Sequence, residues 1–367
     1  MKIGLNATCL NDRPSGARQR FVGIYTEIFK RMREDEFVIY EPSDCSISRW
    51  FNDFENVSYR QTGLSSQSRF QKALRGLRYW AKTLKDERLD IFEGFHLPAV
   101  KSPSGQTLLT IHDIRPLMED RGWKERTLYI NALKRSLELS DHVITVSQSM
   151  RTQFLEHYPD AEISVIYNGI DIEPYNSITH QDLCLAREKF DLPEEFLLAV
   201  GHFEKRKNYI RLIEALARLH ERGRKAYLVG NDSNDLITVK QKIDVLGLSG
   251  HVTIFSGLTD HMVRCIYKLC TLFVFPSAYE GFGIPILEAM AAERPMVISD
   301  IPVFQEITQG QSTYFDQDNP ESISNAIDEV LMSTEERERL VQYGNERVHD
   351  FNFKNLAIDL EKLYKSL

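Results

Sequence analysis

The chain has 367 residues, of which 42% are hydrophobic and 27% are charged, and its formal net charge at pH 7 is −8. A chain of this length can form two hydrophobic cores. The acidic excess falls in the second half, whereas a general nucleic-acid-binding protein would present a basic surface. The five cysteines include no Cys-x-x-Cys pair, so we expect neither a zinc site nor a disulfide scaffold, and we expect a cytoplasmic protein.

Residues 1–7 form a short apolar run that polar residues follow at once. This pattern lacks the apolar core of a signal peptide and predicts the first strand of a fold. No run in the chain approaches the roughly 18 apolar residues that span a membrane.

Short apolar runs alternate with helical periodicity along the chain. In the first half the predicted strands are 2–6, 37–40, 91–93, 107–111, 142–146 and 163–166, and the predicted helices are 20–33, 69–88 and 125–140. In the second half the predicted strands are 196–200, 225–229, 252–255, 272–275 and 295–298, and the predicted helices are 206–221, 235–246, 260–268, 284–292 and 320–333. The alternation predicts an α/β fold with two Rossmann-like, doubly wound domains that face each other across a cleft.

The turn-forming pair Asn168-Gly169 marks the boundary between the two predicted domains. We expect an N-terminal domain at 1–172 and a C-terminal domain at 173–350. We expect the remaining segment, 351–367, to be a helix that crosses back to the N-terminal domain.

The predicted helix 69–88 is amphipathic and has a basic face. Its apolar side holds Phe70, Ala73, Leu74, Leu77, Trp80, Ala81 and Leu84, and its opposite side holds Lys72, Arg75, Arg78, Lys82, Lys85 and Arg88. One interpretation is a helix that lies on an anionic membrane surface. The other, which we favour, is a helix that buries its apolar stripe on the sheet, because the stripe is no wider than that of an ordinary core-facing helix.

Two segments of the second half suit a phosphate or polyhydroxyl ligand. In the first, the strand 272–275 runs through Glu280 and Gly283 into a helix that contains Glu288. Glycine lets the backbone approach a ligand, and a helix N-terminus favours negative charge. In the second, a strand ends at Gly201 and a basic cluster opens the predicted helix 206–221, an unfavourable place for cations unless an anion is bound there.

Two segments of the first half follow predicted strands. His112 and Asp113 come directly after the strand 107–111, at the carboxyl edge of the predicted sheet. The polar loop 11–18 contains Gly16 just before a helix and lacks Gly-x-Gly-x-x-Gly, so a nicotinamide site has no support. Taken alone, a histidine of this kind is more often structural than catalytic.

The spacing of Glu280 and Glu288 resembles the E-x7-E signature of retaining glycosyltransferases of the GT-B fold, and more closely glycosyltransferase family 4. The resemblance implies that Glu280 contacts the donor sugar and that Glu288 holds the nucleotide ribose. It also implies that the backbone amides of Phe282, Gly283 and Ile284 meet the sugar and the diphosphate.

The turn from Gly201 to Asn208 is similar to the G-x-x-x-x-R-K-N turn of the same family. The resemblance places Arg206 and Lys207 on the donor diphosphate. Many relatives have an arginine directly after the glycine, where this chain has His202, so Arg206 would take that role.

Resemblance to the family also covers the first half of the chain. It implies that His112 faces the donor sugar, with Asp113 as a weaker candidate, and that Gly16 lets backbone amides reach the donor phosphate or the acceptor. The N-terminal domain would then bind the acceptor, and the C-terminal domain would bind the nucleotide sugar.

These features predict a metal-independent hexosyltransferase that retains the anomeric configuration and needs no cofactor. The Arg-Lys-Asn turn resembles bacterial mannosyltransferases of surface-polysaccharide assembly, so GDP-mannose is the favoured donor, ahead of UDP-sugars. The expected acceptor is a glycan or a lipid-linked hydroxyl compound. Peripheral contact with the inner face of the membrane through 69–88 stays open as the alternative role of that helix. Two alternatives stay open: a GT-B-like nucleotide-sugar epimerase, and a non-catalytic protein that binds nucleotide sugars.

Overall fold

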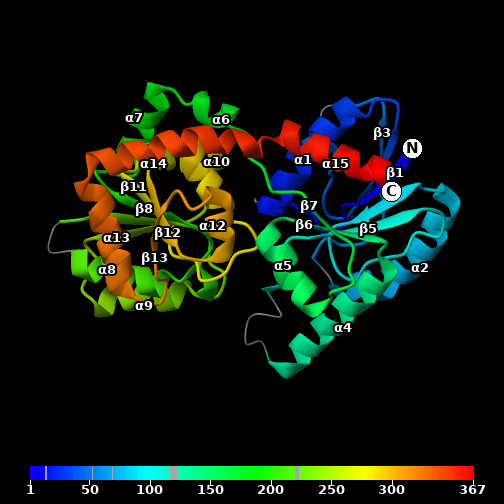
Figure 1. The fold of residues 1–367 in the computed structure, drawn as a ribbon, viewed down its shortest axis with the longest axis horizontal. Helices are drawn as coiled ribbons and strands as arrows, with labels where there is room; N and C mark the ends of the chain where they lie inside the picture. Colours follow the sequence, from blue (N-terminus) through cyan, green and yellow to red (C-terminus); the bar gives the residue numbers. More distant parts are fainter. Residues whose placement is uncertain (13–14, 52, 68, 116–121, 220–222) are drawn as a thin grey trace. The chain divides into compact units, whose positions relative to one another are not determined.

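The computed structural model divides the chain into two compact units, unit 1 with Met1–Gly169 and Phe353–Leu367, and unit 2 with Ile170–Asn352 (Figure 1). It describes residues 1–12, 15–51, 53–67, 69–115, 122–219 and 223–367. The chain passes from unit 1 to unit 2 between Gly169 and Ile170, directly after the turn dipeptide Asn168-Gly169, whereas the first predicted domain ends at residue 172. The last helix belongs to unit 1.

In its described part, unit 1 is built on a seven-stranded parallel sheet with the order β3-β2-β1-β4-β5-β6-β7. The strands are β1 Lys2–Asn6, β2 Glu36–Glu41, β3 Val57–Gln61, β4 Ile91–Gly94, β5 Gln106–Ile111, β6 His142–Thr145 and β7 Ile163–Val165. The helices are α1 Gly16–Arg31, α2 Arg69–Glu87, α4 Trp123–Leu139, α5 Gln148–His157 and α15 Phe353–Ser366, with a 3-10 turn at Ser48–Trp50. Strand order reverses between β1 and β4, the place where open α/β sheets bind ligands.

Helix α15 packs on α1, on one face of this sheet (Figure 1). A side chain at Gly23 of α1 would lie 2.3 Å from the ring of Phe353, so the absence of a Cβ lets the two helices approach closely. Arg31 and Glu361 add an ion pair at 2.7 Å between the same helices. The last helix, which begins at Phe353 and not at the predicted residue 351, is therefore an integral layer of unit 1.

Helix α2 turns its apolar side to the interior over its described part. Trp80 and Leu84 are 3% and 1% exposed and pack with Tyr40 and Phe92, and the ring centroids of Trp80 and Tyr40 lie 5.1 Å apart. The side chains of 69–75 and 77 lie outside the described residues, as do the predictions made for Phe70, Lys72, Ala73, Leu74, Arg75 and Leu77. Ala81, which was predicted on the apolar side, is exposed. From Gly76 onward, α2 is a core-facing helix with an exposed basic face. No helix in the described ranges is both long enough and apolar enough to cross a membrane.

In its described part, unit 2 has a six-stranded parallel sheet with the order β10-β9-β8-β11-β12-β13. The strands are β8 Leu197–Val200, β9 Ala226–Val229, β10 Val252–Phe255, β11 Leu272–Phe275, β12 Met296–Ser299 and β13 Thr313–Phe315. The helices are α6 Glu173–Asn176, α7 His180–Lys189, α8 Tyr209–Leu219, α9 Leu236–Val245, α10 Asp260–Leu269, α11 Ile284–Ala291, α12 Pro302–Thr308, α13 Pro320–Met332 and α14 Thr334–Arg347, with 3-10 turns at Lys205–Lys207 and Val348–Phe351. Here the strand order reverses between β8 and β11.

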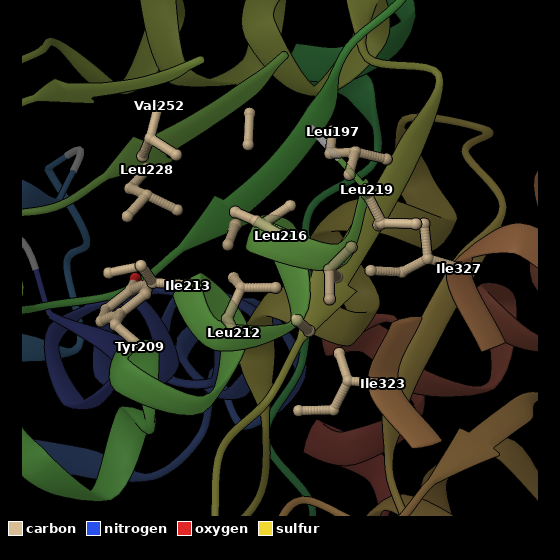
Figure 2. Packing of buried hydrophobic residues seen from close by; sticks show 14 of the residues in the cluster. Leu197, Tyr209, Leu212, Ile213, Leu216, Leu219, Leu228, Val252, Ile323 and Ile327 are labelled. Carbon is tan, nitrogen blue, oxygen red and sulfur yellow. The ribbon is translucent and has the colours of Figure 1, made fainter. Parts of the chain in front are cut away.

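The core of unit 2 lies between α8, α13 and the sheet. Figure 2 shows the labelled apolar residues of α8, from Tyr209 to Leu219, turned toward Leu197 and Leu228 of the strands and toward Ile323 of α13. This packing fixes α8 directly behind the segment that follows β8. The position of Lys205–Lys207 is therefore set by the core and not by a free loop.

Because four tyrosines are buried, we expect the free energy of unfolding to fall at alkaline pH. Burial raises the pKa of Tyr25, Tyr364, Tyr175 and Tyr267 well above 10. The unfolded chain therefore releases these protons at a lower pH than the folded chain, and the free energy of unfolding falls as pH rises above 10. Denaturant titrations from pH 8 to 11 should show this fall together with the appearance of tyrosinate absorbance; ionisation of these tyrosines before unfolding would contradict it.

Candidate functional site

The loop from β11 to α11 is shaped by one glycine. Gly283 caps α11 with φ 118°, a conformation that L side chains rarely adopt, and a Cβ there would lie 2.8 Å from the ring of Phe304. Pro285 lies in the first turn of α11, as predicted. In this first turn Pro285 has no N–H, and the N–H of Ile286 donates to the carbonyl oxygen of Gly283 at 2.9 Å.

Beside this loop, Lys207 and Arg206 share one carboxylate oxygen. Lys207 Nζ and Arg206 Nη1 lie 2.6 and 2.7 Å from Oε1 of Glu280, and the side chains of Lys207 and Glu280 are each 10% exposed. The pairing joins the segments that follow β8 and β11, the two strands at which the order of the sheet reverses. Three of the four charged residues of unit 2 that were predicted for the donor are thus brought together at its switch point.

The predicted start of helix 206–221 is wrong. Lys205–Lys207 forms a 3-10 turn, Asn208 then takes a left-handed conformation with φ 56°, and α8 begins only at Tyr209. Residues 220–222 lie outside the described residues. Arg206 and Lys207 lie in the turn before α8, and the anions that pair with them there are the carboxylates of Glu280 and Glu204.

The charges of this cluster shift the protonation equilibria of its members. Burial raises the pKa of Glu280, but the nearby charges of Lys207 and Arg206 outweigh it and hold this pKa below its ordinary value. Burial lowers the pKa of Lys207, and the charge of Glu280 opposes that shift. We take Glu280 as ionised, because its pKa is lowered, and as paired with Arg206 and Lys207. Removing one member of this cluster would leave another as an uncompensated buried charge.

Neighbouring residues hold the two cations in place. Arg206 Nε donates to Oε2 of Glu204 at 2.8 Å, and the ammonium of Lys207 lies 4.8 Å from the ring centroid of Phe275. A Cβ at Gly201 would lie 3.1 Å from Cε of Lys207, so this glycine leaves room for the lysine stem. Tyr209 donates to the carbonyl oxygen of Gly201 at 2.8 Å.

The second glutamate of the spacing pattern is held by a buried tyrosine. Tyr267 of α10 donates to Oε2 of Glu288 at 3.0 Å, and burial raises the pKa of Glu288. Sequence reasoning missed Tyr267, and it missed Glu204 and Tyr209 as site residues. Their only sequence signals are an apolar helical face for the tyrosines and a position beside the basic cluster for Glu204.

Two matching family models decide the assignment of the chain. The model described as glycosyltransferase family 4 matches residues 37–174, and the model described as glycosyl transferases group 1 matches residues 185–347. The chain belongs to the glycosyltransferases. Its α/β architecture of two Rossmann-like parallel-sheet units is that of the GT-B fold.

Relatives of this glycosyltransferase include proteins named as mannosyltransferases. It is 29% identical over 250 residues to the O-antigen chain mannosyltransferase RfbU of Salmonella typhimurium, covering 68% of this chain and 66% of RfbU. It is 28% identical over 276 residues to the serotype-specific mannosyltransferase WbdA of Escherichia coli, covering 71% of this chain and 33% of WbdA. The matches thus span less than two thirds of these relatives' own length.

A solved structure of similar fold is that of Anabaena HepE in complex with UDP and glucose. The TM-score is 0.77 over the whole of both chains, at 19% sequence identity. At this identity the likeness shows the shared fold and leaves the ligands of the glycosyltransferase to be argued from its own residues.

Two further predicted residues of the glycosyltransferase lie in unit 2, where Phe282 is 3% exposed and Ile284 is the first residue of α11. The others lie in unit 1. His112 follows β5 and is half-buried, and burial together with the charge of Arg20 lowers its pKa to about 3. Asp113 is exposed and accepts a hydrogen bond from the backbone N–H of Arg115 at 3.2 Å. Gly16 is the first residue of α1, after the N-cap Ser15; residues 13 and 14 of its loop lie outside the described residues.

Proposed function

We propose that this glycosyltransferase moves a hexose from a nucleoside diphosphate sugar to an acceptor hydroxyl with retention of the anomeric configuration. The observation that carries the proposal is the pair of Arg206 and Lys207, which both contact Glu280 in the loop that precedes α11. Two cations held by the fold suit a diphosphate leaving group, whose developing charge they would stabilise as the sugar becomes oxocarbenium-like.

The same site assigns roles to the residues around the leaving group. Glu280 and Glu288 would accept hydrogen bonds from the sugar hydroxyls and from the ribose, because carboxyl oxygens are good acceptors for hydroxyl groups. The amides of Phe282, Gly283 and Ile284 would meet the diphosphate at the N-terminus of α11.

In unit 1, a neutral imidazole would suit contact with the donor sugar. With its lowered pKa, His112 is uncharged at neutral pH and can exchange hydrogen bonds with a hydroxyl. We assign His112 to the donor sugar, and Asp113 and Gly16 to the binding of donor or acceptor, in keeping with the family resemblance.

GDP-mannose is the proposed donor, and surface-polysaccharide assembly is the proposed process. The support is the Arg206-Lys207-Asn208 sequence and the names of the relatives RfbU and WbdA. The acceptor would be a glycan or a lipid-linked hydroxyl compound. Membrane contact, if made through α2, would use exposed basic residues of its described part, such as Arg78, Lys82 and Lys85, in a protein that we propose acts in the cytoplasm.

A thermal-shift screen against GDP, UDP, dTDP and ADP tests the donor class. A nucleotide that binds the folded state raises the melting temperature by mass action, so GDP should give the largest shift. Transfer of mannose from GDP-mannose, followed by NMR of the product's anomeric centre, then tests reaction and stereochemistry. Equal shifts for all four nucleotides would remove the basis for GDP-mannose, and release of a free or rearranged sugar without an acceptor would favour an epimerase.

Transfer should be independent of divalent metal ions, because Arg206 and Lys207 supply the charge stabilisation that Mg²⁺ provides elsewhere. The chain contains one Asp-x-Asp sequence, a pattern that can bind metal ions, at Asp316–Asp318 after β13. There Oδ1 of Asp316 accepts a hydrogen bond from the backbone N–H of Asp318 at 2.9 Å. We expect EDTA to leave the turnover rate unchanged. Activity that is lost in EDTA and returns only with Mg²⁺ or Mn²⁺ would show this prediction to be wrong.

A further inference from the structure

The cation pair of unit 2 is already neutralised within the protein. Arg206 and Lys207 carry two positive charges, and Glu280 and Glu204 carry two negative ones, at contact distances of 2.6 to 2.8 Å. The formal charge of the four side chains is therefore zero. A diphosphate that approached this cluster would meet no net positive charge unless one carboxylate moved away.

The two carboxylates are held differently. Glu204 lies two residues before Arg206, as the N-cap of the same 3-10 turn, and accepts a hydrogen bond from Arg206 Nε. Glu280 comes from the loop after β11 and places a single oxygen, Oε1, between Lys207 Nζ and Arg206 Nη1. That oxygen therefore occupies the position between the two cations that a phosphate oxygen would take.

The cations are anchored independently of Glu280. Lys207 lies over the ring of Phe275 and against Gly201. Arg206 also reaches the carbonyl oxygen of Tyr279 at 3.3 Å and keeps Glu204 on its other edge. Departure of the Glu280 carboxylate would thus leave both cations in place and facing the vacated position.

We propose that Glu280 is an exchangeable counter-ion that competes with the donor's diphosphate for Arg206 and Lys207, an inference that rests on the proposed function. Two anions on the same cations repel each other, so binding of a diphosphate displaces the carboxylate. In an intact donor, the sugar hydroxyls give the released carboxylate new hydrogen-bond donors. A nucleoside diphosphate offers no such hydroxyls, so Glu280 returns to the cations and weakens the binding of the product.

Displacement of the Glu280 carboxylate by a diphosphate predicts a result that a role of Glu280 in sugar binding alone does not predict. Glu280→Gln removes the competing charge while keeping the size of the side chain, so GDP and UDP should bind the variant about tenfold more tightly than wild type, since close charge interactions are worth this much or more. Neither probe carries the donor sugar, so no sugar contact is lost. Isothermal titration calorimetry of both nucleotides at fixed salt measures the effect.

Glu204→Gln is the matched control, because it removes the same charge from the same cluster without removing the competitor. Its nucleotide affinity should rise by no more than about threefold, the size of a general charge effect in a partly exposed cluster. Circular dichroism and melting curves check folding. If Glu280→Gln does not fold, Glu280→Asp keeps the charge but shortens the side chain, and its affinity should lie between wild type and tenfold tighter.

The two proposals fail separately. Transfer by wild type together with unchanged or weaker nucleotide binding by Glu280→Gln would overturn the exchange and leave the proposed function standing. A wild-type protein that binds neither nucleotide would overturn the proposed function and the exchange with it. Tighter binding by Glu280→Gln than by Glu204→Gln supports the exchange.

Discussion

Replacing Lys207 by methionine is expected to lower transfer by about 10²–10³-fold, the usual cost of removing one preorganised group that stabilises developing charge. The ammonium of Lys207 is a direct partner of Glu280, which lies in the loop before α11, and we place the leaving group beside this pair. Methionine keeps most of the stem that packs on Phe275 and against Gly201. The loss should therefore come from the missing charge and fall mainly on kcat, with weaker nucleotide binding beside it.

Lys205→Met is the control, since Lys205 belongs to the same 3-10 turn but is exposed. Initial rates with radiolabelled donor, at saturating and sub-saturating concentrations, separate kcat from KM for both variants. We expect the Lys205 variant to keep wild-type kcat. A Lys207→Met protein that is folded and still transfers at more than a tenth of the wild-type rate would show that the lysine has no part in the chemistry.

The parts of this site that could be predicted from the sequence are local in the chain. The loop into α11, with Gly283, Pro285 and the two glutamates, is a continuous segment whose residue types match the conformation that the structure gives it. The turn after β8 is likewise continuous. Both were found because glycine, proline and charge have positional meaning at the ends of strands and helices.

The pairing of Lys207 with Glu280 could not be predicted from residue types, since the two are 73 positions apart in the chain. It depends on β11 lying next to β8, which follows from the reversal of strand order in the sheet. Periodicity shows where strands are and does not give their order. From the sequence we therefore paired the two cations with the diphosphate of a bound donor, whereas in the structure they pair with Glu280.

Several elements that the sequence patterns did not predict, among them β3, β13 and α14, have weak amphipathic patterns. Strand β3, with the sequence VSYRQ, has no buried residue, and the edge strand β13 is only three residues long. Helix α14 is rich in charged residues and buries only Leu340 and Gly344. Elements at the periphery of a domain need little apolar surface, so the pattern that identifies core strands and helices is faint in them.

A second large effect is expected in unit 1, where Glu93→Ala should lower the free energy of unfolding by more than about 3 kcal/mol, because several buried hydroxyl groups would lose their acceptor. Glu93 of β4 is 1% exposed and accepts hydrogen bonds from Thr110 at 2.5 Å, Tyr25 at 2.8 Å and Tyr364 at 2.5 Å. Tyr364 lies in α15, so the variant should also loosen the last helix from the unit.

The three tryptophans, Trp50, Trp80 and Trp123, all lie in unit 1, so urea denaturation followed by their fluorescence reports on this unit alone. Glu34→Ala, at an exposed glutamate of the same unit, is the control and should unfold at the wild-type midpoint. Coincident midpoints for Glu93→Ala and wild type would mean that the hydroxyl groups find other acceptors.

Comparison with Glu93→Gln separates the charge of this carboxylate from its hydrogen bonds. Burial raises the pKa of Glu93 above its ordinary 4.5, against the opposing effect of Thr110, Tyr364 and Tyr25. Because the pKa of Glu93 is raised in the folded state, the folded chain keeps this proton up to a higher pH than the unfolded chain does. The resulting contribution to the free energy of unfolding is therefore complete below pH 4.5 and is lost as pH rises through the folded-state pKa of Glu93. Glutamine does not titrate, so wild type should lose stability relative to Glu93→Gln as pH rises from 4 to 7. A difference that is constant over this range would show that Glu93 has the same pKa in the folded and unfolded states, and that its importance lies in the hydrogen bonds alone.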